Sequence, residues 1–465
     1  MILILAVYTL LSTAVHAEVM VDPSTAANYY RSRSNIIWSC LTTTLLCTWV
    51  SLHPNVPRPV DDATLNMWRR CVHKLRIFLR DQLFPFLLLL AIPEWVLIWA
   101  MRQRLMVEYM MKNRKGLTRT HGFFIIMGGF HKFSRARISK PAVPDPINSI
   151  SAAESGEEKA HKNKRDEEPY GTPNHPLDRF DVCWLLDEGK LELPPEVEIE
   201  DKSKSNWIAK SIVLLQTLWF VIQCIARKLD GLPLTELEVV TLGYALLNFV
   251  IYVIWWNKPQ NVTRPIRVFC GKLPDRTKEQ WELTHTIGEW NDKLFDAVLG
   301  RQDRNVDLRR VKQTPTLYSG NPPKNWPLKA FPIEYFAIMM AAVVGGMFGG
   351  IHFIAWSAQF PTYNMLLLWR CGSILMTIAS FPPLFTLLFG PVLRHEADDE
   401  TLLVSILRCT LLLPVIIFGA LSLFFVPLAY ITGRVITLMI AFKTLSTLPP
   451  EAFRTVQWTN LLPHI

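Results

Sequence analysis

Long apolar runs separated by charged loops are the feature that most constrains how this chain can fold. A transmembrane helix needs about 20 mainly apolar residues. Seven stretches meet or approach that length, at residues 36–52, 82–101, 207–227, 235–256, 333–357, 364–390 and 402–430. The sequence therefore predicts an all-α fold, a polytopic transmembrane helical bundle with about seven membrane helices and amphipathic surface helices between them.

The composition agrees with a membrane protein. Of the 465 residues, 50% are hydrophobic and 19% are charged, against roughly 25% charged residues in soluble domains. The net charge is +9, and surplus Lys and Arg in membrane proteins usually lie beside the spans. Because the basic residues are dispersed and no known nucleic-acid-binding module is visible, we expect the lipid bilayer, and no nucleic acid, as a partner.

Motifs for enzymatic chemistry are absent from the sequence. The eight cysteines form no C-x-x-C pair, which argues against a zinc or redox site. Walker A, H-E-x-x-H and G-x-S-x-G patterns are also missing. We therefore predict no metal and no cofactor, assign no catalytic residue, and favour a non-enzymatic function.

Residues 1–17 resemble a signal peptide, with a short apolar core and small residues at Val15 and Ala17 that suit cleavage. No Lys or Arg precedes the core, so an uncleaved signal anchor stays open as the alternative. The N-terminal membrane region, 18–101, follows. Its first helix, 36–52, is short and rich in Ser and Thr, so it is either a true span or a helix that only enters the membrane.

The central hairpin, 207–256, is the most clearly defined membrane element. Thr235 and Glu238 form a capping box at the start of its second helix. At the far end we expect an interfacial aromatic anchor of Tyr252, Trp255 and Trp256. The C-terminal membrane helices, 333–430, contain prolines that are expected to kink them.

Basic and charged segments separate the membrane regions. Residues 63–80 predict an amphipathic helix that lies on a lipid surface or continues into the next span. Residues 102–206 begin as a basic amphipathic segment and continue as a charged loop, whose part at 141–176 has a disordered composition. Residues 257–332 predict a soluble helical insert, with one amphipathic helix from Trp281 to Val298. Residues 431–465 predict an amphipathic C-terminal segment.

Two features of the sequence predict opposite orientations for the large loops. Lys and Arg counts place 102–206, 258–332 and 391–401 in the cytosol, by the positive-inside rule. A cleaved signal peptide followed by seven spans places the same segments in the lumen. We favour the cytosolic orientation, and the simplest reconciliation is that 36–52 does not cross.

Polar side chains inside the predicted spans are candidates for functional sites, because they are costly in lipid. They are Glu94, His352, Arg370, Arg408, Gln216, Gln223 and Asn248. Glu94 either pairs with Arg370 or Arg408 to lock the bundle, or lies on an ion or proton path. Arg370 is near its helix start, where it can snorkel to the interface.

Structural roles compete with function for the remaining polar residues. His352 is expected to be a hydrogen-bonded structural histidine, and the two glutamines to bond between helices. Four glycines, Gly345, Gly346, Gly349 and Gly350, form overlapping G-x-x-x-G patterns that favour internal helix packing over dimerisation, and a gating hinge is a further option. His121 is the one candidate for interfacial chemistry.

Several segments together resemble a known group of sequences. These are NIIWSCLTTTLLCTWVSLHPNVP (35–57), THGFFIIMGGF (120–130), the hairpin sequence at 215–262, GGIHFIAWSAQFPT (349–362) and LPPEAFRTVQWTNLLPHI (448–465). With them the chain resembles a group of fungal multi-pass membrane proteins without an established activity. The resemblance implies a fungal source and an integral membrane protein, and it transfers no functional residue.

Three functions follow from these features. The first is a channel or transporter-like conduit through the polar intramembrane residues. The second is a membrane-anchored sensor or scaffold that binds soluble proteins through 102–206 and 258–330, with a seven-span receptor as a variant. The third is an interfacial lipid-modifying enzyme that uses His121. The oligomeric state is not predicted.

Overall fold

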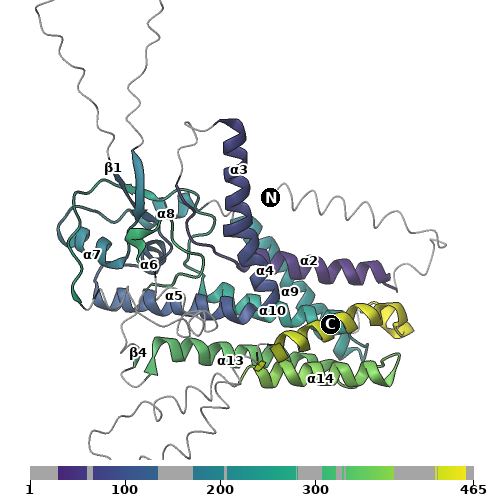
Figure 1. Ribbon diagram of the computed structural model, residues 1–465. Helices are drawn as coiled ribbons and strands as arrows, with labels where there is room; N and C mark the ends of the chain where they lie inside the picture. The colour runs from purple at the N-terminus through teal and green to yellow at the C-terminus, as the bar shows by residue number, and fades with distance from the viewer. Residues whose placement is uncertain are drawn as a thin grey trace, which may run out of the picture.

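The computed structural model describes residues 30–59, 66–134, 171–203, 207–278, 280, 306–320, 327–328, 331–381, 425–426 and 428–456. Helices dominate this part of the chain, as predicted, but strands are also present. The prediction of a purely α fold therefore needs correction. Figure 1 shows a helical bundle joined to a lobe of strands and short helices. The predicted signal peptide, residues 141–170 of the linker, and Arg408 lie outside the described residues.

Two helices run side by side in the same direction through the bundle. They are α2 (Arg33–Ser51) and α10 (Glu236–Ile254), each 19 residues long. At their starts, Arg31 forms an ion pair with Glu238. Near their ends, the Ser51 hydroxyl donates to Asn248 Oδ1 over 2.6 Å. At about 1.5 Å per residue, α2 therefore covers the same depth of the bundle as α10.

The next segment is a long helical run that breaks sharply. It comprises α3 (Met67–Ile77), the π-helix η2 (Phe78–Leu83), α4 (Phe84–Ala91) and α5 (Pro93–Asn113). The run up to Ala91 and α5 differ in direction by 116°. Pro93 begins α5 because its missing N–H is tolerated only in the first turn of a helix. Residues 82–101 therefore do not form one straight helix, and the bent pair is either a broken span or a re-entrant loop.

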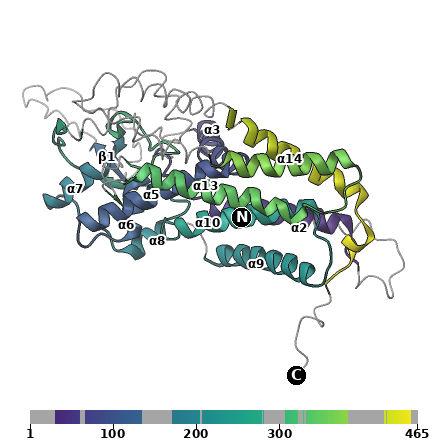
Figure 2. The same cartoon turned by 90° about the horizontal axis from the view of Figure 1, so that it is seen from below.

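In the part of the chain that the structure describes, four helices are long and apolar enough to cross a membrane. They comprise Ser211–Leu229 of α9 (Trp207–Leu229), α10, Phe336–Ala355 across α13 (Ile333–Ile351) and η5 (His352–Ala355), and Leu428–Thr447. The bent pair would make a fifth, so seven spans are not reached among the described residues. The stretch 431–447, predicted as an amphipathic surface helix, belongs to one of these four. α14 (Tyr363–Ala379) returns beside α13 (Figure 2).

Several predicted details of the bundle are confirmed. The capping box at Thr235 and Glu238 is present at the start of α10. Three of the four glycines serve internal packing, because an added Cβ would meet Ser380 at Gly345, Phe381 at Gly346 and Thr377 at Gly349. Gly350 faces open space instead.

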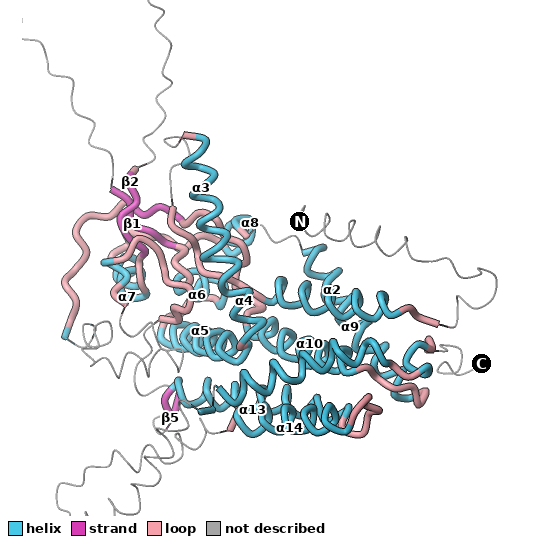
Figure 3. The backbone as a smooth tube through the Cα atoms, turned by 45° about the vertical axis from the view of Figure 1, so that its right-hand side comes forward, coloured by secondary structure: helices cyan, strands magenta, loops and turns pink. Residues whose placement is uncertain are grey.

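The lobe is built from segments far apart in sequence. Strand β1 (Phe130–Ser134) lies between β2 (Thr172–Pro176), which is antiparallel to it, and β3 (Ile266–Val268), which is parallel. Short helices surround this sheet (Figure 3), namely α6 (Arg119–Ile126), α7 (Arg179–Asp187), α8 (Glu196–Lys202) and the 3-10 turn η4 (Leu308–Arg310). A separate two-stranded ribbon pairs β4 (Pro327–Leu328) with β5 (Phe331–Pro332), and the 3-10 turns η6 (Leu445–Thr447) and η7 (Pro450–Phe453) follow the last helix.

The lobe corrects three predictions about the loops. The basic segment at 102–119 is not a surface helix, because it continues α5 and buries Arg102, Gln103 and Met106. The end of the predicted linker forms β2. The described part of the insert at 257–332 contains strands and a 3-10 turn in place of helix, while the predicted helix at Trp281–Val298 lies outside the described residues.

Candidate functional site

Glu94 lies at the sharp break between α4 and α5, where it is in the first turn of α5 and not in mid-helix as predicted. A negative charge is favoured there by the helix dipole. Its carboxylate accepts a hydrogen bond from the Tyr430 hydroxyl through Oε1. Its Oε2 lies 3.7 Å from Arg434 Nη1, within ion-pair distance. Both partners come from helix 428–447.

Arg434 is enclosed by aromatic rings. Its guanidinium carbon lies 4.4 Å from the ring centroid of Phe348, 5.0 Å from Tyr244 and 5.5 Å from Tyr430. Nη1 also donates to the Tyr430 hydroxyl over 2.9 Å. Such contacts stabilise a desolvated cation. The arrangement therefore holds one positive and one negative charge among three helices that are long and apolar enough to span a membrane.

The helix break reaches the middle of the bundle. Tyr244, at the midpoint of α10, donates its hydroxyl proton to the carbonyl oxygen of Leu90 over 2.6 Å. Leu90 is in the last turn of α4, where the carbonyls lose their partners inside the helix. In Figure 1, α3 stands crosswise to the bundle and α5 runs into the lobe. The pair thus turns at Ile92, beside Tyr244, and α5 leads from there back to the lobe.

A pocket of about 200 Å³ opens beside the ion pair. Its lining includes Ile92, Tyr244, His352 and Arg434. Two charged atoms at the site are buried without a hydrogen-bond partner, Glu94 Oε2 and Arg434 Nη2. Buried polar atoms are nearly always satisfied, so unfilled positions on both members of one pair are unusual. The site can therefore accept a further hydrogen-bonding group or ion.

Of the other predicted polar residues, only His352 joins this site. Its Nδ1 lies 2.8 Å from the Phe348 carbonyl oxygen, which fits the predicted structural role. Arg370 does not pair with Glu94, because it donates twice to the Trp356 carbonyl and lies 4.8 Å over the Trp356 ring. Gln216 and Gln223 are both partly buried on α9, and their interhelical hydrogen bonding stays a prediction.

Asn248 makes hydrogen bonds between two helices. It accepts from Ser51 and donates from Nδ2 to Thr48 Oγ1 over 3.2 Å, which joins α10 to α2. It also lines a separate pocket of about 580 Å³ between α2, α9 and α10. The lining of that pocket is uncharged, so Asn248 serves helix packing at its wall.

His121 is fully engaged in holding α6. Its Nδ1 lies 2.8 Å from the Thr118 hydroxyl, and its Nε2 lies 2.7 Å from the Pro194 carbonyl oxygen. The residue completes the capping box at the start of α6. Because both ring nitrogens already have partners, this conformation leaves neither available for acid–base chemistry.

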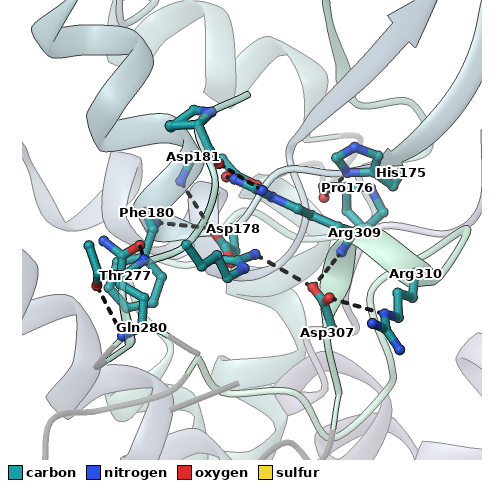
Figure 4. A network of polar contacts seen from close by, with 12 residues as sticks. His175, Pro176, Asp178, Phe180, Asp181, Thr277, Gln280, Asp307, Arg309 and Arg310 are labelled. Atoms are coloured by element: carbon teal, nitrogen blue, oxygen red, sulfur yellow. Dashed lines mark hydrogen bonds and ion pairs between the residues drawn. The ribbon is translucent and has the colours of Figure 1, made fainter. Parts of the chain in front are cut away.

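A second charged cluster lies in the lobe, where it joins α7 to η4 (Figure 4). Asp178 caps α7 and accepts from Arg276 Nη2 over 2.6 Å, and Arg309 binds the Asp181 carboxylate with two nitrogens. Burial and the neighbouring Asp181 raise the pKa of Asp178, against the lowering effect of Arg276. The cluster fastens distant segments to one another, and Arg276 in turn lies 3.5 Å from Asp307.

A buried lysine closes the end of the bundle nearest the lobe. Lys258 Nζ donates to the carbonyl oxygen of His53 and the side-chain oxygens of Asn55 and Gln103, between the rings of Trp99 and Trp255. Burial lowers the pKa of the amine well below its usual range, whereas the three acceptors and two ring faces favour the ammonium. Trp255 is therefore buried in this cluster and is not the predicted interfacial anchor.

Sequence reasoning missed Arg434 and Tyr430. The signal was available, because the two residues are four apart and share a face of an apolar stretch. The sequence analysis instead divides the two residues, with Tyr430 at the end of the predicted membrane helix 402–430 and Arg434 in the amphipathic C-terminal segment 431–465. The candidate site thus combines Glu94, which the sequence analysis singled out, with Arg434 and Tyr430, which it did not.

Comparisons with known proteins place part of this chain in context. Residues 185–277 match a family of unknown function (DUF8562), a region that runs from α7 through the hairpin of α9 and α10 to Arg276. No curated protein and no solved structure matches the chain. The match covers the hairpin and its approaches, and it does not include Glu94 or Arg434.

Proposed function

We propose that this chain is a multi-pass membrane protein of fungal origin that acts as a channel or transporter-like conduit. The observation that supports this best is the Glu94–Arg434 pair, which lies at a helix break, beside a pocket, within apolar helices. Ionisable groups among apolar membrane helices are costly, so they usually either line a transport pathway or pair with one another to hold the helices together. Broken helices at this depth occur where they line a cavity or are covered by protein.

The geometry indicates how such a conduit would work. A cation that reaches Glu94 Oε2, which has no hydrogen-bond partner, would compete with Arg434 for the carboxylate. Arg434 would then be held by Tyr430 and the aromatic rings. Departure of the cation restores the pair. Binding of a transported ion at Glu94 would thus be coupled to the position of Arg434, which lines the pocket.

Flux through proteoliposomes tests the proposal. The purified chain is reconstituted with a pH-sensitive dye inside, and an outward or inward proton or ion gradient is imposed. We expect flux in the wild type and its loss in Glu94→Gln, with Glu451→Gln, an exposed carboxylate near the C-terminus, as the matched control. Thermal unfolding of both variants shows whether they fold. Absence of wild-type flux under every gradient would count against a conduit, and full flux in Glu94→Gln would remove the site from the path.

A sensor or scaffold is the second candidate. It is favoured by the lobe, which is a folded unit outside the apolar helices and is fastened by buried ion pairs. Deleting 258–330 would not test it cleanly, because that deletion removes β3 and Arg309 from the lobe itself. A better test reverses the exposed charges of Lys272 and Lys278 and asks whether a stoichiometric soluble partner is lost while the lobe stays folded.

A further inference from the structure

Helix α3 has no buried residue, which is unusual for a helix of 11 residues. Met67 is 89% exposed and Trp68 is 76% exposed, although both are large and apolar. In Figures 1 and 3 the helix lies crosswise to the bundle, at the level where the bundle meets the lobe. If the apolar helices cross a bilayer, α3 lies along the membrane surface on the lobe side.

A shallow pocket of about 480 Å³ runs along α3 into α4. It is lined by four apolar residues and two arginines, Val72, Leu75, Leu79, Phe84, Arg76 and Arg80. The two guanidinium groups are four residues apart and thus on one side of the helix. Apolar walls with cations on one side fit a molecule that has a hydrocarbon part and a negatively charged part.

Helix α3 is strongly basic. It carries Arg69, Arg70, Lys74 and Arg76 and no acidic residue within its bounds. Arg80 approaches Asp81 only at 3.9 Å, and its side chain is 58% exposed. An anion placed between Arg76 and Arg80 would therefore meet two available guanidinium groups, which bind phosphate through paired N–H donors.

We infer that this pocket binds an anionic phospholipid of the leaflet on the lobe side. The phosphate lies between Arg76 and Arg80, and an acyl chain covers Leu75, Leu79 and Phe84. A free phosphate would leave those apolar walls in water, so the lipid fits both halves of the pocket. The inference rests on the proposed membrane location but not on conduction, and anionic lipids are typical of the cytosolic leaflet.

Binding of a fluorescent phosphatidylserine to the full chain in neutral detergent micelles, followed by anisotropy, tests this site. The variant Arg76→Gln/Arg80→Gln removes both pocket charges. The matched control, Arg70→Gln/Lys74→Gln, removes two charges at the same spacing that do not line the pocket. Because only the pocket variant loses the two guanidinium groups that would hold the phosphate, we expect it to bind about thirtyfold more weakly and the control nearly as tightly as the wild type.

The outcomes separate the possible sources of binding. Competition by unlabelled phosphatidylserine, but not by phosphatidylcholine or inorganic phosphate, supports the lipid site. Equal loss in both double variants would overturn it, since binding would then depend on net charge alone. Full competition by inorganic phosphate would overturn it as well. Because no flux is measured, failure here leaves the conduit untouched, and failure of the conduit leaves this site untouched.

Discussion

Arg434 Nη1 lies 3.7 Å from Glu94 Oε2, so one ion pair joins the tip of the bent helices to the C-terminal helix. Both side chains are largely buried, at 10% and 13% exposure. Breaking a buried pair leaves one charge uncompensated, whereas removing both charges does not. The pair should therefore show strong coupling between its two substitutions.

A double-mutant cycle measures that coupling. We expect Glu94→Gln and Arg434→Met each to lower the free energy of unfolding by about 3–5 kcal/mol, and the double variant to lose less than the sum. Chemical unfolding in detergent, followed by tryptophan fluorescence, gives the values. Strict additivity of the two losses would show that the ion pair contributes nothing to stability.

The glycines of α13 make a second prediction with an internal control. At Gly349 a new Cβ would lie 2.6 Å from the Thr377 backbone nitrogen, and backbone atoms cannot move aside cheaply. Gly349→Ala should therefore push α14 from α13 and lower stability by about 1–3 kcal/mol. Gly350→Ala meets no atom within 4 Å and should be neutral or stabilising by up to about 1 kcal/mol. Equal melting temperatures for the two variants would contradict the close approach.

Lys258 provides a third prediction. Its amine donates to the His53 carbonyl oxygen, to Asn55 Oδ1 and to Gln103 Oε1. In Lys258→Met the two side-chain oxygens keep one donor each, Gln103 Nε2 and Trp255 Nε1, while the His53 carbonyl loses this donor. A buried acceptor left unsatisfied costs about 1–3 kcal/mol, so Lys258→Met should destabilise the chain by about that amount. Lys228→Met, at the exposed end of α9, should change stability by less than about 0.5 kcal/mol. Thermal unfolding of both variants in the same detergent makes the comparison. Similar melting temperatures would show that the buried contacts of Lys258 contribute little to stability.

The sequence was informative wherever a feature is local. The cap at Thr235 and the close-packed glycines of α13 follow from short motifs and were predicted correctly. Glu94 was singled out because a carboxylate in an apolar run is costly. Each of these features depends on residues that are close together in the sequence, within one or two helical turns.

Features that depend on distant segments were missed. Residues 82–101 have the composition of one span, although Pro93 can equally begin a new helix, and only packing against Tyr244 and Arg434 decides for the break. Likewise, β1 pairs with β3 across a long stretch of chain, and short strands in a polar loop carry no periodic pattern. Hydropathy shows which stretches are apolar enough to enter a membrane, but not whether a helix crosses the membrane or turns back within it.

His131 gives a pH-dependent prediction for the lobe. The residue is 2% exposed on β1, and burial, with a smaller effect from His175, lowers its pKa to about 4. The unfolded chain takes up the same proton near pH 6.5. Between these values only the unfolded state is protonated, so stability falls as the pH falls, by about 3 kcal/mol in total, and levels off below pH 4.

Hydrogen exchange of the β1 amides at pH 7 and at pH 5 checks the effect. His131→Phe should flatten the pH dependence, because it removes the titrating group from the same buried position. His73→Phe, on α3 and away from the lobe sheet, should leave it as in the wild type. A wild-type slope that persists in His131→Phe would assign the pH dependence to another group.

The bundle offers another way to reconcile the two orientation signals. α2 starts beside the start of α10 and ends beside its end, so we expect it to cross if α10 crosses. The bent pair is either a broken span or a re-entrant loop, and as a re-entrant loop it would not cross. A lumenal residue 30 and a cytosolic lobe are then compatible, which reverses the reconciliation expected from the sequence, in which 36–52 stayed on one side.

Glycosylation mapping decides this topology. We expect an acceptor site placed in 145–165 to give no endoglycosidase-sensitive mass shift, because β1 and β2, which that segment connects, are both in the lobe. An acceptor site in an extended turn at 230–234, at the other end of the bundle, should be modified, which also shows that the chain is inserted. A shift at 145–165 would place the lobe in the lumen, contradict the positive-inside count and revive a receptor-like role.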